Sequence, residues 1–95
     1  MKKTVKVVTI TIEAKKLYEE QEGVLLFKSG ARSKLTMIPK KCIYNFEKVI
    51  TTFTSWKGKS DRKAFRFDIP LWYYLKIDHK LKGFFDSIII ENTHK

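Results

Sequence analysis

The sequence contains little of what builds disulfide frameworks and metal centres. Its 95 residues include one cysteine, Cys42, and two histidines, His79 and His94. One cysteine cannot close a disulfide within the chain, and these three residues lack the spacing of a zinc site. We therefore expect no metal and no cofactor, and a buried structural thiol at Cys42.

Long apolar segments and glycine-rich loops are also missing. No run approaches the ~20 apolar residues that a membrane-spanning helix requires, and the four glycines do not form a phosphate-binding loop. The basic start resembles a signal peptide only briefly, because Lys6 interrupts the apolar stretch and Glu13 and Lys15 follow it. These absences predict an intracellular, cytoplasmic protein without a membrane partner.

Apolar and aromatic residues are plentiful enough for a core. Hydrophobic residues make up 43% of the chain and aromatic residues 14%, which is too apolar for a disordered tail. The length provides room for one core. We therefore expect a single small basic domain over residues 1–95, with 92–95 as a frayed tail.

The charge is strongly one-sided. Twenty Lys and Arg residues against ten Asp and Glu residues give a formal net charge of +10. Self-repulsion at this charge destabilises a compact chain, so the charge points to a binding role. A nucleic acid is the first candidate, because each neutralised phosphate releases counterions. The alternative is a basic surface that keeps the protein in solution or contacts an acidic protein.

Period-two alternation predicts several strands. Val8, Ile10 and Ile12 alternate with threonines within residues 3–13, which indicates a strand with one apolar face. Residues 24–38 and 51–69 each place a turn between extended segments, as in a β-hairpin. Residues 87–91 predict a buried closing strand, and residues 14–22 a helical turn or a solvated loop.

Two segments that follow prolines are predicted to be helical. After Pro39, apolar residues recur at steps of three and four through residue 50, as on one face of a helix. Residues 71–81 fit a helix or a strand, and the position after Pro70 favours the helix. The expected fold is α+β, an antiparallel, hairpin-rich sheet packed against one or two short helices.

The cations gather at the two predicted hairpin turns. The second turn also has Trp56 at its edge, and an exposed aromatic face stacks on unpaired bases while cations contact phosphates. The expected function is non-catalytic binding of DNA or RNA, with Phe65 and Phe67 directed into the core. The expected contact residues are Lys28, Arg32, Lys34, Trp56, Lys57, Lys59, Arg62, Lys63 and Arg66.

Two other functions stay open. A protein-interaction factor, such as a viral or mobile-element protein that inhibits a host complex, fits the small size and the aromatic run 72–74, which also makes a homodimer plausible. A metal-dependent nuclease is the third option. It rests on Asp68, Asp78 and Lys80, a short pattern that arises easily in a lysine-rich chain.

Two short segments resemble known families. Residues 66–70 (Arg-Phe-Asp-Ile-Pro) resemble the strand–Ile-Pro–helix element of swapped-hairpin transcription factors and antitoxins, but lack the Leu-Gly pair expected at the helix end. The strand before Pro70 and residues 72–76 are similar to the strand-to-helix step of whirly-type single-stranded DNA-binding proteins, which curl a four-stranded sheet against a helix. Both resemblances imply nucleic-acid binding, and each is too short to assign a family.

Overall fold

The computed structural model describes residues 6–30, 32 and 34–92, which form two antiparallel sheets and one α-helix. The strands are β1 (Val7–Glu13), β2 (Leu17–Gln21), β3 (Val24–Phe27), β4 (Thr36–Pro39), β5 (Tyr44–Ser55), β6 (Gly58–Pro70) and β7 (Ile88–Asn92). The α-helix is α1 (Leu71–Leu81), and the short 3-10 helices are η1 (Ala14–Lys16), η2 (Lys40–Cys42) and η3 (Lys82–Ser87). The fold is α+β, as predicted.

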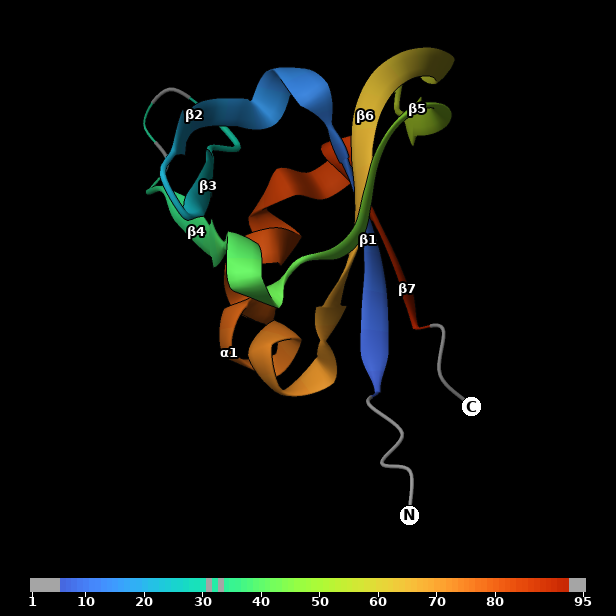
Figure 1. The fold of residues 1–95 in the computed structure, drawn as a ribbon. Helices are drawn as coiled ribbons and strands as arrows, with labels where there is room; N and C mark the ends of the chain where they lie inside the picture. Colours follow the sequence, from blue (N-terminus) through green and yellow to red (C-terminus); the bar gives the residue numbers. More distant parts are fainter. Residues whose placement is uncertain (1–5, 31, 33, 93–95) are drawn as a thin grey trace.

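The larger sheet has the strand order β5-β6-β1-β7, and the smaller has the order β2-β3-β4. Pairing within each sheet is antiparallel. Helix α1 and η3 lie between the two sheets, and the β5–β6 hairpin curves away at the top of the molecule (Figure 1).

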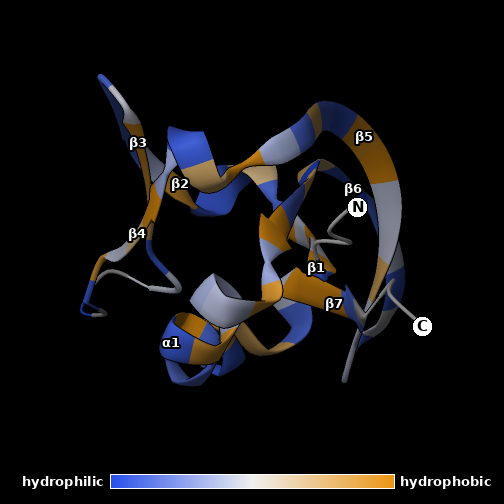
Figure 2. Cartoon of the chain, turned by 60° about the horizontal axis from the view of Figure 1, so that its bottom comes forward, coloured by the Kyte–Doolittle hydropathy of each residue, from blue (hydrophilic) through white to orange (hydrophobic). Residues whose placement is uncertain are grey.

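The core fills the space between the sheets and α1. Val8, Ile10 and Ile12 are almost fully buried on one face of β1, where Phe67 and Ile69 of β6 lie beside them. Ile77 and Leu81 of α1, together with Phe27 and Ile38 of the smaller sheet, complete the same cluster. Hydrophobic residues accordingly follow β1, β7 and one side of α1 in Figure 2.

The strand β1 confirms the prediction for the described part of residues 3–13. Thr9 and Thr11, expected on an open face, are also buried. Thr9 donates a hydrogen bond of 2.6 Å to Asp68 on the neighbouring strand. Both threonines are on a central strand between β6 and β7, and the apolar pattern alone does not predict their burial.

The predicted helix after Pro39 is wrong. Lys40–Cys42 is a single 3-10 turn, and the chain then enters the twelve-residue strand β5. The run Val49-Ile50-Thr51-Thr52 is β-branched and favours a strand. Pairing with β6 also satisfies the backbone along most of this length, so tertiary contacts override the helical spacing.

Two further predictions need correction. Residues 17–21, expected within a helical turn or loop, form the edge strand β2, whose exposed Glu19 and Glu20 suit an unpaired edge. The closing strand β7 is present, but its isoleucines are only half-buried because β7 is also an edge. Residues 93–95 of the predicted tail lie outside the described residues.

The ambiguous segment 71–81 is a helix, as favoured. Pro70 ends β6 and provides the extended residue before the first turn of α1. The Tyr73 hydroxyl donates a hydrogen bond of 2.7 Å to the Met37 carbonyl, which ties α1 to the smaller sheet. No helix in the described part of the chain is long and apolar enough to cross a membrane.

Candidate nucleic-acid interface

The β5–β6 hairpin is the longest element pair in the molecule. Its strands run twelve and thirteen residues, and Ser55 pairs with Gly58 across a two-residue turn, Trp56-Lys57. Gly58 has φ of 115°, a conformation that side chains with a Cβ rarely adopt. The glycine therefore permits the tight turn that brings the basic residues to one end of the hairpin.

The turn presents one aromatic ring and one cation to solvent. Trp56 is 89% exposed, and the Lys57 amino group lies 5.2 Å from the centre of its ring. Ser55 accepts a hydrogen bond from the Lys57 backbone N–H at 3.3 Å. The indole is therefore exposed at the tip of the hairpin, with the Lys57 amino group over its ring.

Arg62 has a different environment from the lysines around it. Its Nη1 donates a hydrogen bond of 3.0 Å to Glu13, whose side chain is only 6% exposed, and its Nε donates one of 2.8 Å to Ser60. The guanidinium also lies 5.6 Å from the ring centre of buried Phe53. Arg62 therefore anchors the hairpin to the end of β1 and is poorly placed to contact a phosphate.

The remaining cations of β6 divide between its two faces. Alternation along the strand puts Lys59 and Lys63 on the face of Phe65, and Arg66 on the opposite face. All three are exposed. Arg66 lies opposite Glu47 of β5, so its charge is partly balanced, whereas Lys63 lies opposite Ile50.

The first basic hairpin is far from the second. Lys28, Arg32 and Lys34 belong to the β3–β4 connection of the smaller sheet, and Figure 1 shows this connection on the opposite side of the molecule from the β5–β6 turn. The Lys28 amino group lies 4.6 Å from the ring centre of Tyr18, and Arg32 and Lys34 are exposed. The predicted basic residues therefore form two separate regions.

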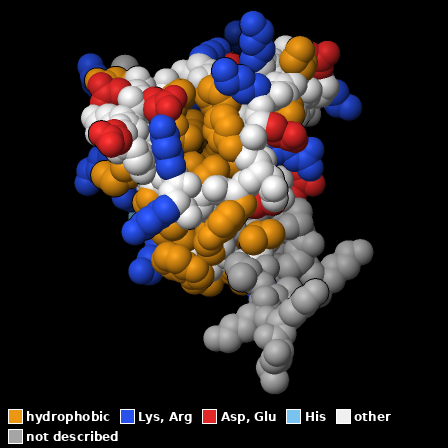
Figure 3. Space-filling view, in the orientation of Figure 1, with side chains coloured by type: hydrophobic (Ala, Val, Ile, Leu, Met, Phe, Trp, Pro, Cys, Tyr) orange, Lys and Arg blue, Asp and Glu red, His pale blue; other side chains and the backbone are white. Residues whose placement is uncertain are grey.

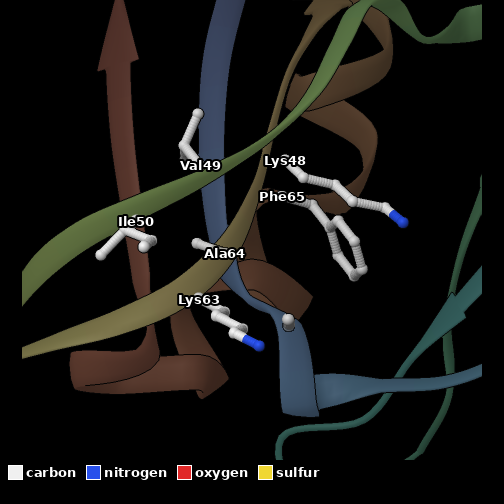
Figure 4. A pocket seen from close by; sticks show the side chains of 7 residues that line it. Lys48, Val49, Ile50, Lys63, Ala64 and Phe65 are labelled. Atoms are coloured by element: carbon white, nitrogen blue, oxygen red, sulfur yellow. The ribbon is translucent and has the colours of Figure 1, made fainter.

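A groove on the hairpin was missed by sequence reasoning. It has a volume of about 720 Å³ and is here called the inner groove. Its lining residues are Ala14, Lys48, Val49, Ile50, Lys63, Ala64 and Phe65. In Figure 4, the side chains of Lys48 on β5 and Phe65 on β6 lie side by side, and Lys63 is also on β6.

Three of the groove residues, Lys48, Val49 and Ile50, come from the segment that was wrongly predicted to be a helix. As a strand, residues 46, 48 and 50 share one face, and their sequence Phe-x-Lys-x-Ile mixes an exposed aromatic with a cation. Reading 44–55 together with 58–70 as one long hairpin would have placed Lys48 beside Phe65. The β-branched run that follows was the signal for that reading.

Phe46 connects the inner groove to a second hollow. It is 45% exposed, and its ring stacks on Phe65 at a centroid distance of 5.4 Å and on buried Phe67 at 6.1 Å. The second hollow, of about 290 Å³, is lined by Glu20, Leu25, Lys40, Ile43 and Phe46. In Figure 3, apolar side chains are visible in a central hollow bordered by Lys and Arg.

Two pKa values are displaced near these elements. The Lys40 amino group donates a hydrogen bond of 2.6 Å to Glu20 and, with its positive charge, lowers the pKa of this exposed carboxyl. Burial raises the pKa of Tyr73 above its ordinary value, and nearby Cys42 adds to the effect. Neither group belongs to the basic hairpin.

The acids of the nuclease hypothesis lie apart. Asp68 is on the outer face of β6, where it accepts hydrogen bonds from Thr9 at 2.6 Å and from Asn45 at 2.9 Å. Asp78 is on α1, which packs against the opposite face of that sheet, and is 3.8 Å from Lys82. No cluster of three His, Cys, Asp or Glu residues suited to a metal occurs in the described ranges.

Comparison with known proteins adds no family. No protein-family description, no curated protein and no solved structure matches the chain. The strand–proline–helix step that resembles two families is present at Pro70, but neither family is supported beyond it. The exposed residues and the groove of the β5–β6 hairpin are therefore the features that indicate a function.

Proposed function

We propose that the protein is a non-catalytic nucleic-acid-binding domain whose main contact surface is the β5–β6 hairpin. The observation that supports this is the row of Lys48, Lys57, Lys59 and Lys63 along the hairpin, with exposed Trp56 at its turn. One carboxylate, Asp61, lies between Lys59 and Lys63 on the same face of β6 and accepts a hydrogen bond from Thr52 at 2.5 Å, so cations outnumber acids here. An excess of cations attracts phosphates, and an open indole stacks on bases.

The salt dependence of binding tests this proposal. Affinity for a random single-stranded oligonucleotide should fall steeply with salt, since each contacted phosphate contributes about −0.7 to the slope of log K against log salt. The triple variant Lys57→Glu, Lys59→Glu, Lys63→Glu should reduce that slope by about 2. Arg62 is left unchanged because its loss would disturb the contact with Glu13.

A variant with the same net charge is the control. Lys41→Glu, Lys76→Glu, Lys80→Glu removes as many positive charges from exposed positions on η2 and α1. This variant should keep most of the wild-type slope, because the slope depends on the number of phosphates that lysines contact and these three lysines lie away from the hairpin. Equal slopes in the two triple variants, or no salt-sensitive binding by the wild type, would contradict the proposal.

A protein partner is the second candidate, and helix α1 favours it. Trp72 and Leu75 are 57% and 62% exposed on this helix, and Lys76 lies 5.4 Å from the Trp72 ring centre. Exposed aromatic and aliphatic residues beside a cation are typical of protein interfaces. The variants Trp72→Ala and Leu75→Ala test this candidate. It is supported if they no longer bind a protein partner of the wild type and keep full affinity for nucleic acid.

A further inference from the structure

We infer that the inner groove binds an unpaired base of a single-stranded nucleic acid, stacked on Phe65, with the adjoining phosphates on Lys48 and Lys63. This inference rests on the proposed function and names the kind of nucleic acid. The groove volume of about 720 Å³ falls within the usual range of ligand sites, about 300–1,000 Å³. A duplex keeps its bases inside and cannot offer one to the groove.

The aromatic floor of the groove is rigid. Phe65 is half-buried and stacks on Phe46, which stacks in turn on Phe67, a residue of the core. Phe67 continues the series to Phe27, with ring centroids 6.3 Å apart. A ring held in this way loses little freedom when a base stacks on it, so more of the stacking energy contributes to affinity.

The charges of the groove match a phosphate backbone. Lys48 is the cross-strand partner of Phe65, and Lys63 is two residues before it on β6, on the same face. In the view of Figure 4, the Phe65 ring lies between the amino ends of these lysines. Among its described lining residues, the groove has no Asp or Glu.

The groove suits a nucleic acid better than an acidic peptide. The backbone groups of β5 and β6 are paired with each other along this part of the hairpin, from Glu47–Arg66 to Ser55–Gly58. Peptide recognition on strands uses the free backbone of a sheet edge, which here is the outer edge of β5, whereas the groove is lined by side chains of both β5 and β6. A base needs only the ring face and the apolar walls, and its phosphates need only the lysines.

The test compares a dT12 oligonucleotide with a 12-mer of abasic sites, which has the same phosphates but no bases. The wild type should bind dT12 at least about fivefold more tightly than the abasic strand, since stacking on one aromatic has an effect of this size. In a Trp56→Ala background, which removes stacking on the hairpin turn, Ala14→Leu fills the groove and should lower dT12 affinity to the abasic level. It should leave abasic binding unchanged.

Phe65→Leu provides a second variant, with the highly exposed Phe85→Leu as its matched control. Only Phe65→Leu should reduce the preference for dT12. Equal binding of both oligonucleotides by the Trp56→Ala protein, with normal salt dependence, would overturn the inference and leave the proposed function standing. Absence of binding to either would overturn both. If oligoglutamate competes for the groove as well as dT12 does, the groove binds an acidic peptide and the inference is overturned.

Discussion

At the residue scale, Arg62 and Lys63 are adjacent cations in opposite surroundings. Arg62 points to the outer face of β6 and pairs with Glu13, while Lys63 borders the inner groove. Both residues carry the same charge, and only alternation along the strand separates the cation that pairs with Glu13 from the cation that borders the groove. The β1 residue that Arg62 meets is distant in sequence, and this contact could not be predicted.

We predict that Arg62→Gln destabilises the fold and Lys63→Gln does not. Among the described residues, Arg62→Gln leaves Lys15, at 3.4 Å, as the remaining ion-pair partner of the buried Glu13 carboxylate, and it should lower the free energy of unfolding by roughly 1–3 kcal/mol. Lys63→Gln should change it by less than about 0.5 kcal/mol. Urea unfolding measures both, and equal losses would contradict the assigned roles.

Asn45 gives β5 its irregular start. It has φ of 56°, and the register shifts by one residue between Tyr44 and Glu47, which forms a bulge. The Asn45 amide donates its hydrogen bond to Asp68 across the strands. The bulge sets which residues of β5 share the face of the inner groove.

Substitutions at Asn45 should separate the contribution of its hydrogen bond to Asp68 from the strain of its left-handed backbone. Asn45→Ala loses the hydrogen bond and also strains the left-handed backbone, at a combined cost of roughly 1–2 kcal/mol. Asn45→Gly loses only the hydrogen bond and adds some chain entropy, so it should cost less. Thermal or urea unfolding of both variants decides this, and a more stable Ala variant would show that the bulge is unstrained.

At the element scale, a hydrogen bond joins α1 to the smaller sheet in addition to their apolar packing. Tyr73 donates to the Met37 carbonyl, and its raised pKa means that the fold favours the neutral phenol. Above pH ~10 the unfolded chain loses this proton more readily than the folded one, so stability falls as pH rises.

The variant Tyr73→Phe tests this contact. At neutral pH it should lower the free energy of unfolding by about 1 kcal/mol through loss of the hydrogen bond. It should also weaken the decline in stability between pH 9 and 11, because the group that titrates there is gone. An unchanged alkaline decline in Tyr73→Phe would show that other groups cause it.

Some elements could be predicted from the local sequence pattern, and others are decided by strand pairing with residues distant in sequence. Alternation at Val8, Ile10 and Ile12 was sufficient for β1, and Pro70 was sufficient for the start of α1. Residues 43–50 satisfy a helical and an extended pattern, and only pairing with β6 decides between them. The exposed Trp56 could be predicted, but the inner groove could not, because it needs that pairing.

At the scale of the whole molecule, charge is distributed unevenly. The edge strand β2 and the turn after it expose Glu19, Glu20 and Glu22, whereas the charged residues that the β5–β6 hairpin exposes are mostly cations. Figure 3 shows acidic side chains on both sides of the central hollow and Lys and Arg side chains along its upper and left borders. Such asymmetry orients an approaching polyanion toward the hairpin. The homodimer stays a prediction, which sedimentation at several concentrations would test.

The two tryptophans report on the two candidate surfaces. Trp56 is on the hairpin turn and Trp72 on α1, and both indoles are largely exposed. Their N–H signals in a ¹H–¹⁵N spectrum can be assigned from a Trp72→Phe variant. During titration with dT12, we expect a progressive shift of the Trp56 signal while the Trp72 signal stays in place. A shift of Trp72 alone, or of neither signal at saturating oligonucleotide, would contradict nucleic-acid binding by the hairpin.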